Sequence, residues 1–289
     1  MTDMPDKEQP LISVIMGVLY QRENINLLER AVRSIQNQTY QNLELLICDD
    51  GSTEAARQYL VKAAAQDERI HLIRGCPRTD LASKLNWCLK AAKGTYIARM
   101  DDDDWSVPSR FEKQLHVLEE NPAAAFVGSN VKLWSGGRFV GVRELPQSPE
   151  IRDFLFVQPF IHPTLMFRHA ALLAVDGYSE DRHCLKCEDY DLLLRLYENE
   201  YRGANLQECL LDYSLPDTAK GYRTMGDRWN ETVTRYKRFR ELGILPQKIF
   251  FVVKPLAVGV VPASIIKRLK RCLIIKKQER KTKGEFNNP

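Results

Sequence analysis

Short apolar runs alternate with amphipathic stretches through the first 120 residues of the chain. The predicted strands are residues 11–16, 43–48, 70–73 and 95–99. The predicted helices are residues 24–38, 53–66, 81–93 and 110–120. This alternation is typical of βαβ units, so we expect an α/β fold with a Rossmann-like, mostly parallel sheet flanked by helices.

After Asn121 the pattern changes. Residues 124–133 and 138–142 are predicted strands joined through the turn at residues 135–137, and residues 161–167 are another predicted strand. Residues 192–197 lie on a predicted helix. No repeat or low-complexity linker interrupts the chain, so we expect one catalytic domain over residues 1–245 and a separate tail over residues 246–289.

The tail combines an apolar stretch with a basic helix. Residues 249–266 are almost entirely apolar, but Pro255 and Pro262 are expected to break a regular helix. A spanning helix needs about 20 apolar residues, and this stretch is near that limit but broken. Residues 265–273 predict an amphipathic helix with a basic polar side, typical of a membrane interface. A true span and a helix packed on the body remain the alternatives.

Composition separates the body of the chain from its tail. The 289 residues are 44% hydrophobic and 28% charged, which excludes a disordered chain. The net charge of +4 is uneven: residues 247–289 carry eleven Lys/Arg and two Glu, a charge of +9, which leaves −5 on residues 1–246. An acidic body with a basic tail argues against nucleic-acid binding and favours an anionic membrane surface.

The N-terminus and the cysteines indicate the compartment. Residues 1–10 lack the charged start and apolar stretch of a secretory signal, and seven irregularly spaced cysteines do not suggest a disulfide framework. We therefore expect a reducing cytoplasm. The pair Cys184 and Cys187 is a C-x-x-C match without a second pair, which we interpret as a coincidence.

Acidic clusters follow two of the predicted strands. Asp49 and Asp50 come after one strand, and the four residues 101–104 are all aspartates after another. Ligands gather at the carboxyl ends of strands in open α/β sheets, and adjacent carboxylates repel unless a cation compensates them. Oxygen ligands of this kind suit Mg²⁺ or Mn²⁺ bound together with substrate phosphates. A solvated acidic turn is the alternative.

A third acidic cluster lies at Glu188, Asp189 and Asp191. On a helix, residues 188 and 191 share a face while residue 189 points elsewhere. One carboxylate of this cluster suits a general base while its neighbour orients a substrate hydroxyl. The alternative is a helix N-terminus, where acids complement the helix dipole.

Five motifs in order resemble family 2 glycosyltransferases over residues 11–213. They are residues 12–16 with Ser34-Ile-Gln-Asn-Gln-Thr-Tyr40, Cys48-Asp-Asp-Gly-Ser-Thr53, residues 94–105 with Pro108 and Arg110, His162-Pro-Thr164 with Gly177-Tyr178, and Glu188-Asp-Tyr-Asp-Leu192. The resemblance implies a GT-A fold and inverting transfer of a sugar from a nucleotide donor.

The resemblance also assigns roles to matching residues. It places Asp50 at the donor base, Asp102 near the ribose, and Asp103 on a divalent metal with Asp101 assisting. Asp189 matches the catalytic base of the family's Glu-Asp pair, with Glu188 as its partner.

Weaker candidates come from positions where the family pattern is loose. The segment 17–21 departs from the common Pro-Val-Tyr-Asn, so Tyr20 is our candidate to flank the base. Lys84 and Arg99 are candidates for the donor phosphates, against ordinary surface roles. His162 is a candidate site residue or a structural histidine. Further candidates are Lys220 or Arg223 for a phosphate, because residues 213–216 lack the family's Arg and His, and Trp134 with residues 154–160 for an acceptor groove or the core.

These observations lead to one functional hypothesis. We expect a metal-dependent inverting glycosyltransferase that uses Mn²⁺ or Mg²⁺ and moves a hexose or N-acetylhexosamine from a UDP-sugar. The resemblance, with the basic tail, implies a lipid-pyrophosphate-linked saccharide acceptor in O-antigen or capsule synthesis, a β-linkage, and a place on the inner face of the cytoplasmic membrane. The alternatives are a protein or teichoic-acid acceptor, or a non-catalytic sugar-nucleotide-binding scaffold.

Overall fold

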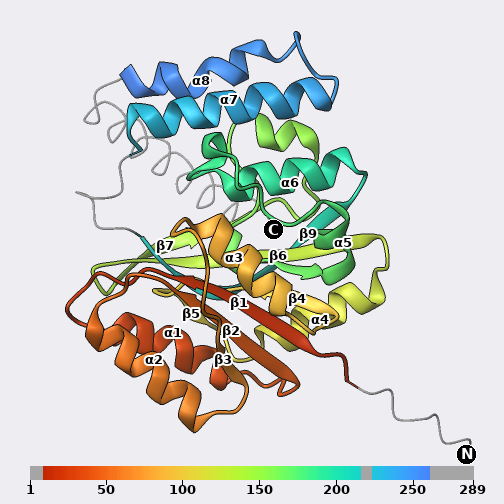
Figure 1. The fold of residues 1–289 in the computed structure, drawn as a ribbon. Coiled ribbons are helices and arrows are strands. Elements are labelled where there is room, and N and C mark those ends of the chain that lie inside the picture. Colours follow the sequence, from red (N-terminus) through yellow and green to blue (C-terminus); the bar gives the residue numbers. More distant parts are fainter. Residues whose placement is uncertain (1–8, 216–222, 261–289) are drawn as a thin grey trace, which may run out of the picture.

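The first half of the chain builds a parallel sheet with helices on both sides (Figure 1). The computed structural model describes residues 9–215 and 223–260. The strands β1 (Ile12–Val18), β2 (Leu43–Asp49), β3 (Ile70–Leu72) and β4 (Tyr96–Arg99) pair in parallel in the order β3-β2-β1-β4. The helices α1 (Asn26–Gln36), α2 (Glu54–Gln66) and α3 (Leu81–Ala91) connect them. The α/β fold predicted from the hydrophobic pattern is confirmed.

The second half extends the same sheet with mixed pairing. The elements are β5 (Trp105–Ser106), α4 (Arg110–Glu120), β6 (Ala124–Ser135), β7 (Arg138–Arg143), β8 (Met166–Arg168) and β9 (Arg202–Ser214). β8 is antiparallel to β4 and to β6, whereas β6 and β9 are parallel. The pairing is therefore entirely parallel in the first half and mixed in the second, because β8 runs antiparallel to both of its neighbours.

One prediction for this half was wrong in detail, and one strand was missed. The expected strand over residues 161–167 is instead a turn of 3-10 helix, η2 (His162–Thr164), followed by the short strand β8, because Pro163 stands within the turn. The other 3-10 turns are η1 (Ile151–Leu155) and η3 (Arg182–Cys184). The long strand β9 was not predicted from the pattern.

Helices form a separate layer above the sheet (Figure 1). The helices are α5 (His169–Ala174), α6 (Glu188–Glu198), α7 (Met225–Glu241) and α8 (Ile249–Val260). α8 packs along α7 and continues through Pro255, so the prediction that this proline ends a helix was wrong. The Pro255 carbonyl oxygen accepts a hydrogen bond from Arg228 at 3.2 Å. In the described residues, no helix has both the length and the apolarity needed to cross a bilayer.

The core is divided by the sheet into two clusters. One lies with α1, α2 and α4 and includes Val14, Leu28 and Phe111. The other lies with α3, α6 and α7 and includes Phe126, Leu193 and Phe239. The second cluster attaches the helical layer to the sheet, so the site between the two layers has fixed walls.

A buried ion cluster connects α6 to α7. Asp191 is 1% exposed, and its carboxylate lies 2.8 Å from Nε of Arg195 and 3.0 Å from Nε of Arg238. Arg195 also donates to the Gly177 carbonyl oxygen at 2.7 Å. Because removing one partner of a buried ion pair leaves the others uncompensated, this carboxylate stabilises the join between the two helices.

Replacing Asp191 by Ala should therefore lower the free energy of unfolding by about 3–5 kcal/mol, because Arg195 would keep a buried charge without its carboxylate. Chemical denaturation measures the loss. The matched control is Glu120→Ala, which breaks an exposed i,i+4 pair with His116 and should cost less than about 1 kcal/mol. Equal losses for the two variants would contradict the interpretation.

Candidate active site

The four aspartates 101–104 form a loop at the carboxyl end of β4, which we call the aspartate loop. Its backbone is held from β9 and α1. The Ser214 hydroxyl and Arg30 both donate to the Asp103 carbonyl oxygen, the latter at 3.4 Å. The backbone N–H of Ser214 donates to Oδ1 of the buried Asp104 at 2.7 Å. The predicted cluster is therefore a fixed loop at the centre of the sheet edge, and not a free acidic turn.

Burial and mutual repulsion make these carboxylates hard to ionise together. Burial, with Asp101 and Asp103 nearby, raises the pKa of Asp102 to about 7. Burial and Asp101 raise the pKa of Asp103 to about 6, although Arg22 lies 3.2 Å from its carboxylate. The loop therefore carries more negative charge than its neighbours neutralise, which is the condition that favours a bound cation.

No ready-made metal cage accompanies the loop. Across residues 9–215 and 223–260, no three His, Cys, Asp or Glu side chains are grouped to hold a metal ion by themselves. Mg²⁺ and similar ions, however, are often held by one or two carboxylates together with substrate phosphates. Asp101 and Asp103 are both partly exposed on the loop, and their carboxylate oxygens are of the type that suits such an ion.

Arg99 lies directly beneath the aspartate loop. Its side chain is 0% exposed and forms an ion pair with Asp101. Among the described residues its Nε and Nη1 atoms have no hydrogen-bond partner. The guanidinium group therefore contacts the loop through one nitrogen and is closed to solvent, and its assignment to a donor phosphate stays a prediction.

Glu188 and Asp189 begin α6 and face two different cavities. Asp189 lines a cavity of about 500 Å³ that Asp101 also lines, which we call the Asp189 cavity. Glu188 lines a neighbouring cavity of about 350 Å³ together with Leu19 and Asp80. Burial and the adjacent Asp189 raise the pKa of Glu188 to about 7. The two consecutive carboxylates at the start of α6 thus face different cavities.

Two hydrogen bonds orient Asp189. Gln158 donates from Nε2 to Oδ2 at 2.8 Å, and the backbone N–H of Tyr190 donates to Oδ1 at 2.7 Å. Burial raises the pKa of Asp189, and the hydrogen bond from Gln158 opposes this rise. A fixed carboxylate with a raised pKa, facing a cavity, has the properties of a general base.

The candidates on the nucleotide side lie where β1 and β2 end. Lys84 of α3 is buried, and its ammonium group donates to the carbonyl oxygens of Val18 at 2.6 Å and of Asp50 at 3.3 Å. Gly51 has φ +88°, which glycine adopts freely, and the turn brings Ser52 to accept from the backbone N–H of Tyr20 at 2.8 Å. Lys84 therefore fixes the loop that carries Asp50 and is not a surface residue.

The Tyr20 side chain is more buried than we expect of a residue that flanks the donor base. Its side chain is 3% exposed, and its hydroxyl group donates to the Asn24 carbonyl oxygen at 2.9 Å. Arg22 lies 6.0 Å from the ring centroid. The assignment of Tyr20 to the donor base stays a prediction.

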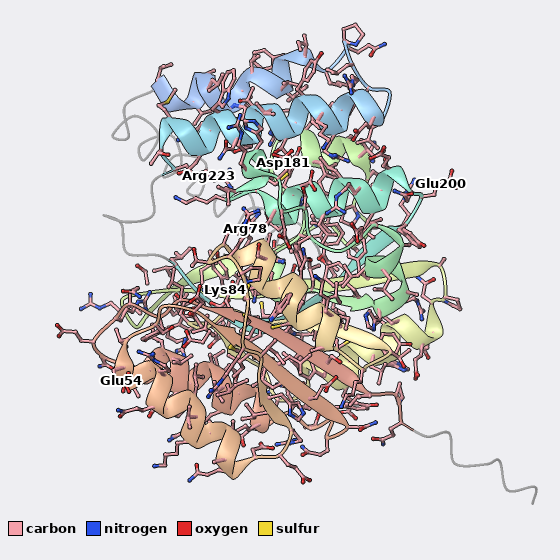
Figure 2. The ribbon with its side chains drawn as sticks, in the orientation of Figure 1. Glu54, Arg78, Lys84, Asp181, Glu200 and Arg223 are labelled. Atoms are coloured by element: carbon pink, nitrogen blue, oxygen red, sulfur yellow. The ribbon has the colours of Figure 1, made fainter. Side chains whose placement is uncertain are left out.

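The weaker candidates are distributed over several places. His162 is buried, and its Nε2 lies 2.8 Å from the Tyr178 hydroxyl; burial lowers its pKa well below the usual value. Arg223 lines the Asp189 cavity, and Figure 2 shows it between the α7–α8 layer and the labelled Arg78 and Lys84. Lys220 lies outside the described residues. Cys184 and Cys187 are free thiols.

The aromatic candidates separate into two groups. Phe156 and Phe160 line the Asp189 cavity, whereas Phe154 is fully buried in the core. Trp134 lines a different cavity of about 240 Å³ next to Arg22. An acceptor role thus remains open for part of residues 154–160.

The sequence reasoning missed several residues of the Asp189 cavity, among them Arg143, Gln158, Glu231 and Arg235. Gln158 orients Asp189, and Arg143 of β7 also lines the cavity. Gln158 stands inside the aromatic stretch 154–160, where a lone amide was the available signal. Arg143 gave no sequence signal, because it directly follows the predicted strand 138–142 and belongs to none of the family motifs.

Comparison with known proteins identifies the family of the chain. The family model described as "Glycosyl transferase family 2" matches residues 13–173. EpsE of Bacillus subtilis, a protein that carries a glycosyltransferase name, is 35% identical over 280 residues, covering 96% of this chain and 99% of EpsE. The O-antigen biosynthesis glycosyltransferase WbnJ of Escherichia coli is 35% identical over 211 residues, covering 71% of this chain and 80% of WbnJ.

Solved structures show the same fold. TarS (residues 1–349) of S. aureus, solved in complex with UDP-GlcNAc, superposes with a TM-score of 0.65 at 17% identity, covering 84% of this chain and 72% of that chain. The mannosyltransferase PcManGT of Pyrobaculum calidifontis, in complex with GDP-Man and Mn²⁺, gives 0.60 at 19% identity, covering 95% and 83%. The fold is the GT-A fold of these enzymes, and the chain belongs to glycosyltransferase family 2.

Proposed function

We propose that this enzyme is a metal-dependent inverting glycosyltransferase that moves a hexose or N-acetylhexosamine from a UDP-sugar to a lipid-pyrophosphate-linked saccharide in cell-surface polysaccharide synthesis. One observation carries the proposal: Asp101 of the aspartate loop and Asp189 of α6 line the same cavity. A carboxylate loop suited to a cation and a diphosphate is thereby opposite a carboxylate suited to a base.

The donor side of this proposal uses the aspartate loop. Asp50 would contact the base and Asp102 the ribose, as in the family motif, with Lys84 fixing the Asp50 loop. Asp103, assisted by Asp101, would hold Mn²⁺ or Mg²⁺. When bound, the cation neutralises the charge that develops on the diphosphate leaving group. Arg99 stabilises the loop from below and keeps donors that suit phosphate oxygens.

The acceptor side uses Asp189. Its carboxylate takes the proton from the attacking hydroxyl group while Gln158 and the Tyr190 N–H hold it in place. Attack on the face opposite the leaving diphosphate inverts the anomeric carbon, so an α-linked donor gives a β-linkage. No acid is needed to protonate the leaving group, which leaves Glu188 free to act on the other side of α6.

The choice of substrates rests on similarity. TarS was solved with UDP-GlcNAc, and WbnJ is named for O-antigen biosynthesis. Transfer to a protein or a teichoic acid is the alternative within enzymes. A non-catalytic scaffold is the alternative outside them, and it gives no reason for the two fixed hydrogen bonds on Asp189.

Replacing Asp189 by Asn should abolish transfer while UDP binding persists, because the amide cannot accept the acceptor's proton.

In the native enzyme the rate should fall as pH falls through the raised pKa of Asp189, since only the ionised carboxylate is a base. Replacing Gln158 by Leu removes a hydrogen bond that lowers this pKa, so the acidic limb of the pH–rate profile should move to higher pH. Appreciable turnover by the Asp189 variant, or an unmoved limb, would refute the base assignment.

Residues 246–289 complete the proposal as a tail that holds the enzyme on the inner face of the cytoplasmic membrane. The outward positions of α8 are Ile249, Phe250, Val253, Ala257 and Val260, at helical spacing and all apolar. Apolar patches of this kind mark interaction surfaces. The nine Lys/Arg of residues 261–289 follow directly in the sequence.

A flotation assay tests the tail. The full chain should float with vesicles that contain anionic lipid and not with neutral vesicles, because each basic residue near such a surface contributes about 1 kcal/mol. A chain that ends at Val260 keeps α8 and should lose most of this binding. Equal flotation of both chains, or none by the full chain, would contradict the membrane role.

A further inference from the structure

Three arginines line the Asp189 cavity, and they differ in their contacts with the rest of the protein. Arg235 is buried, lies 3.0 Å from the Glu231 carboxylate, and has its guanidinium 4.6 Å from the centre of the Tyr190 ring. Arg223 forms an ion pair with the same Glu231 and donates to the Lys186 carbonyl oxygen at 3.0 Å. Both of these arginines are engaged with the protein itself.

Arg143 differs from the other two. Its Nη2 donates to the Gln158 carbonyl oxygen at 3.1 Å. Arg143 forms no ion pair with any residue of the described ranges 9–215 and 223–260. Burial lowers its pKa, while Tyr213 and Asp189 oppose this effect. A guanidinium group has five N–H donors in a planar fork that fits phosphate or carboxylate oxygens. Most of the donors of Arg143 thus remain for a ligand.

Gln158 connects Arg143 to the base. Its backbone carbonyl oxygen accepts from Arg143, and its side chain donates to Asp189. Gln158 thus contacts both Arg143 and Asp189, and these two residues line the same cavity. A ligand that gives a hydroxyl group to Asp189 is placed to meet Arg143 as well.

The edge of this cavity is apolar and exposed. Phe156 and Val157 line it and are 63% and 58% exposed. The Lys254 ammonium group of α8 donates to the Phe156 carbonyl oxygen and lies 5.6 Å from the ring centroid. The ring of Phe251 meets that of Phe156 edge-on at 4.9 Å. The cavity that contains Arg143 thus has an apolar edge, and this edge continues into α8.

We propose that Arg143 binds an anionic group of the acceptor, a phosphate or a carboxylate, while a neighbouring hydroxyl group of that acceptor reaches Asp189. This inference rests on the proposed function and names the charge class of its acceptor. An anion bound here balances a guanidinium that has no ion-pair partner among the described residues, and Arg143 offsets the repulsion that Asp101 and Asp189 of the same cavity exert on it. The apolar edge favours a phosphate that carries a lipid, and an acidic sugar is the other source of the same chemistry.

Equilibrium binding tests this inference separately from catalysis. Calorimetry in the presence of UDP would compare three probes: a short-chain polyprenyl-pyrophosphate saccharide, a uronic-acid saccharide, and an octyl glycoside of the same neutral sugar. For the native enzyme, the anionic probe that matches the acceptor should bind more tightly than the neutral one. Replacing Arg143 by Gln should weaken that probe about tenfold to hundredfold and leave the neutral glycoside unchanged, because a charge-assisted bidentate contact is lost.

Control variants separate binding from folding. Arg138→Gln lies on the same strand and is exposed, so it should bind all probes as the native enzyme does. Arg143→Lys keeps the charge and should restore part of the affinity. Equal weakening of the anionic and neutral probes by Arg143→Gln, undiminished anionic binding, or no preference of the native enzyme for either anion would overturn the proposal. Transfer assays with the same probes report on the proposed function alone, since binding can persist where turnover fails.

Discussion

Repulsion between buried carboxylates is the constraint around which this enzyme is organised. Four aspartates follow β4 without a break, and burial raises the pKa values of Asp102 to about 7 and of Asp103 to about 6. The protein offsets only part of this charge, through Arg99 beneath the loop and Arg22 at its rim. Ser214 and Arg30 also hold the loop backbone through the Asp103 carbonyl oxygen, which limits how far the carboxylates can separate. The remaining negative charge would attract a cation, and the cation in turn would bind the nucleotide diphosphate.

The helical layer supplies the opposite wall of the site. α6 begins with two acids that diverge into two cavities, and the Asp191 cluster anchors the same helix to α7. The position of Asp189 therefore depends on packing that lies a full helical layer away from the aspartate loop. A loss of that packing would move Asp189 relative to the aspartate loop without a change in the residues of either.

The sequence was informative where periodicity and burial agree. The parallel half of the sheet follows from runs such as residues 11–16, and the family motifs locate Asp103 and Asp189 in the chain. β9 was missed because its buried positions include Gly203 and Asn205, so no apolar alternation exists. The Nδ2 group of Asn205 donates to the carbonyl oxygens of Pro146 and Pro159, partners that are distant in sequence. The burial of Lys84 and the bond from Gln158 to Asp189 are equally non-local, and only the folded chain reveals them.

The most direct test of this account is a calorimetric titration of Mn²⁺ or Mg²⁺ into the enzyme, with and without UDP. Because the loop carries unbalanced carboxylates but no complete cage among the described residues, the metal should bind well only when the diphosphate is present. Asp103→Ala should lose this linkage, and a chelator should stop transfer by the native enzyme. Equal UDP affinity with and without metal, together with full transfer in the presence of chelator, would contradict the central claim that the aspartate loop works through a cation.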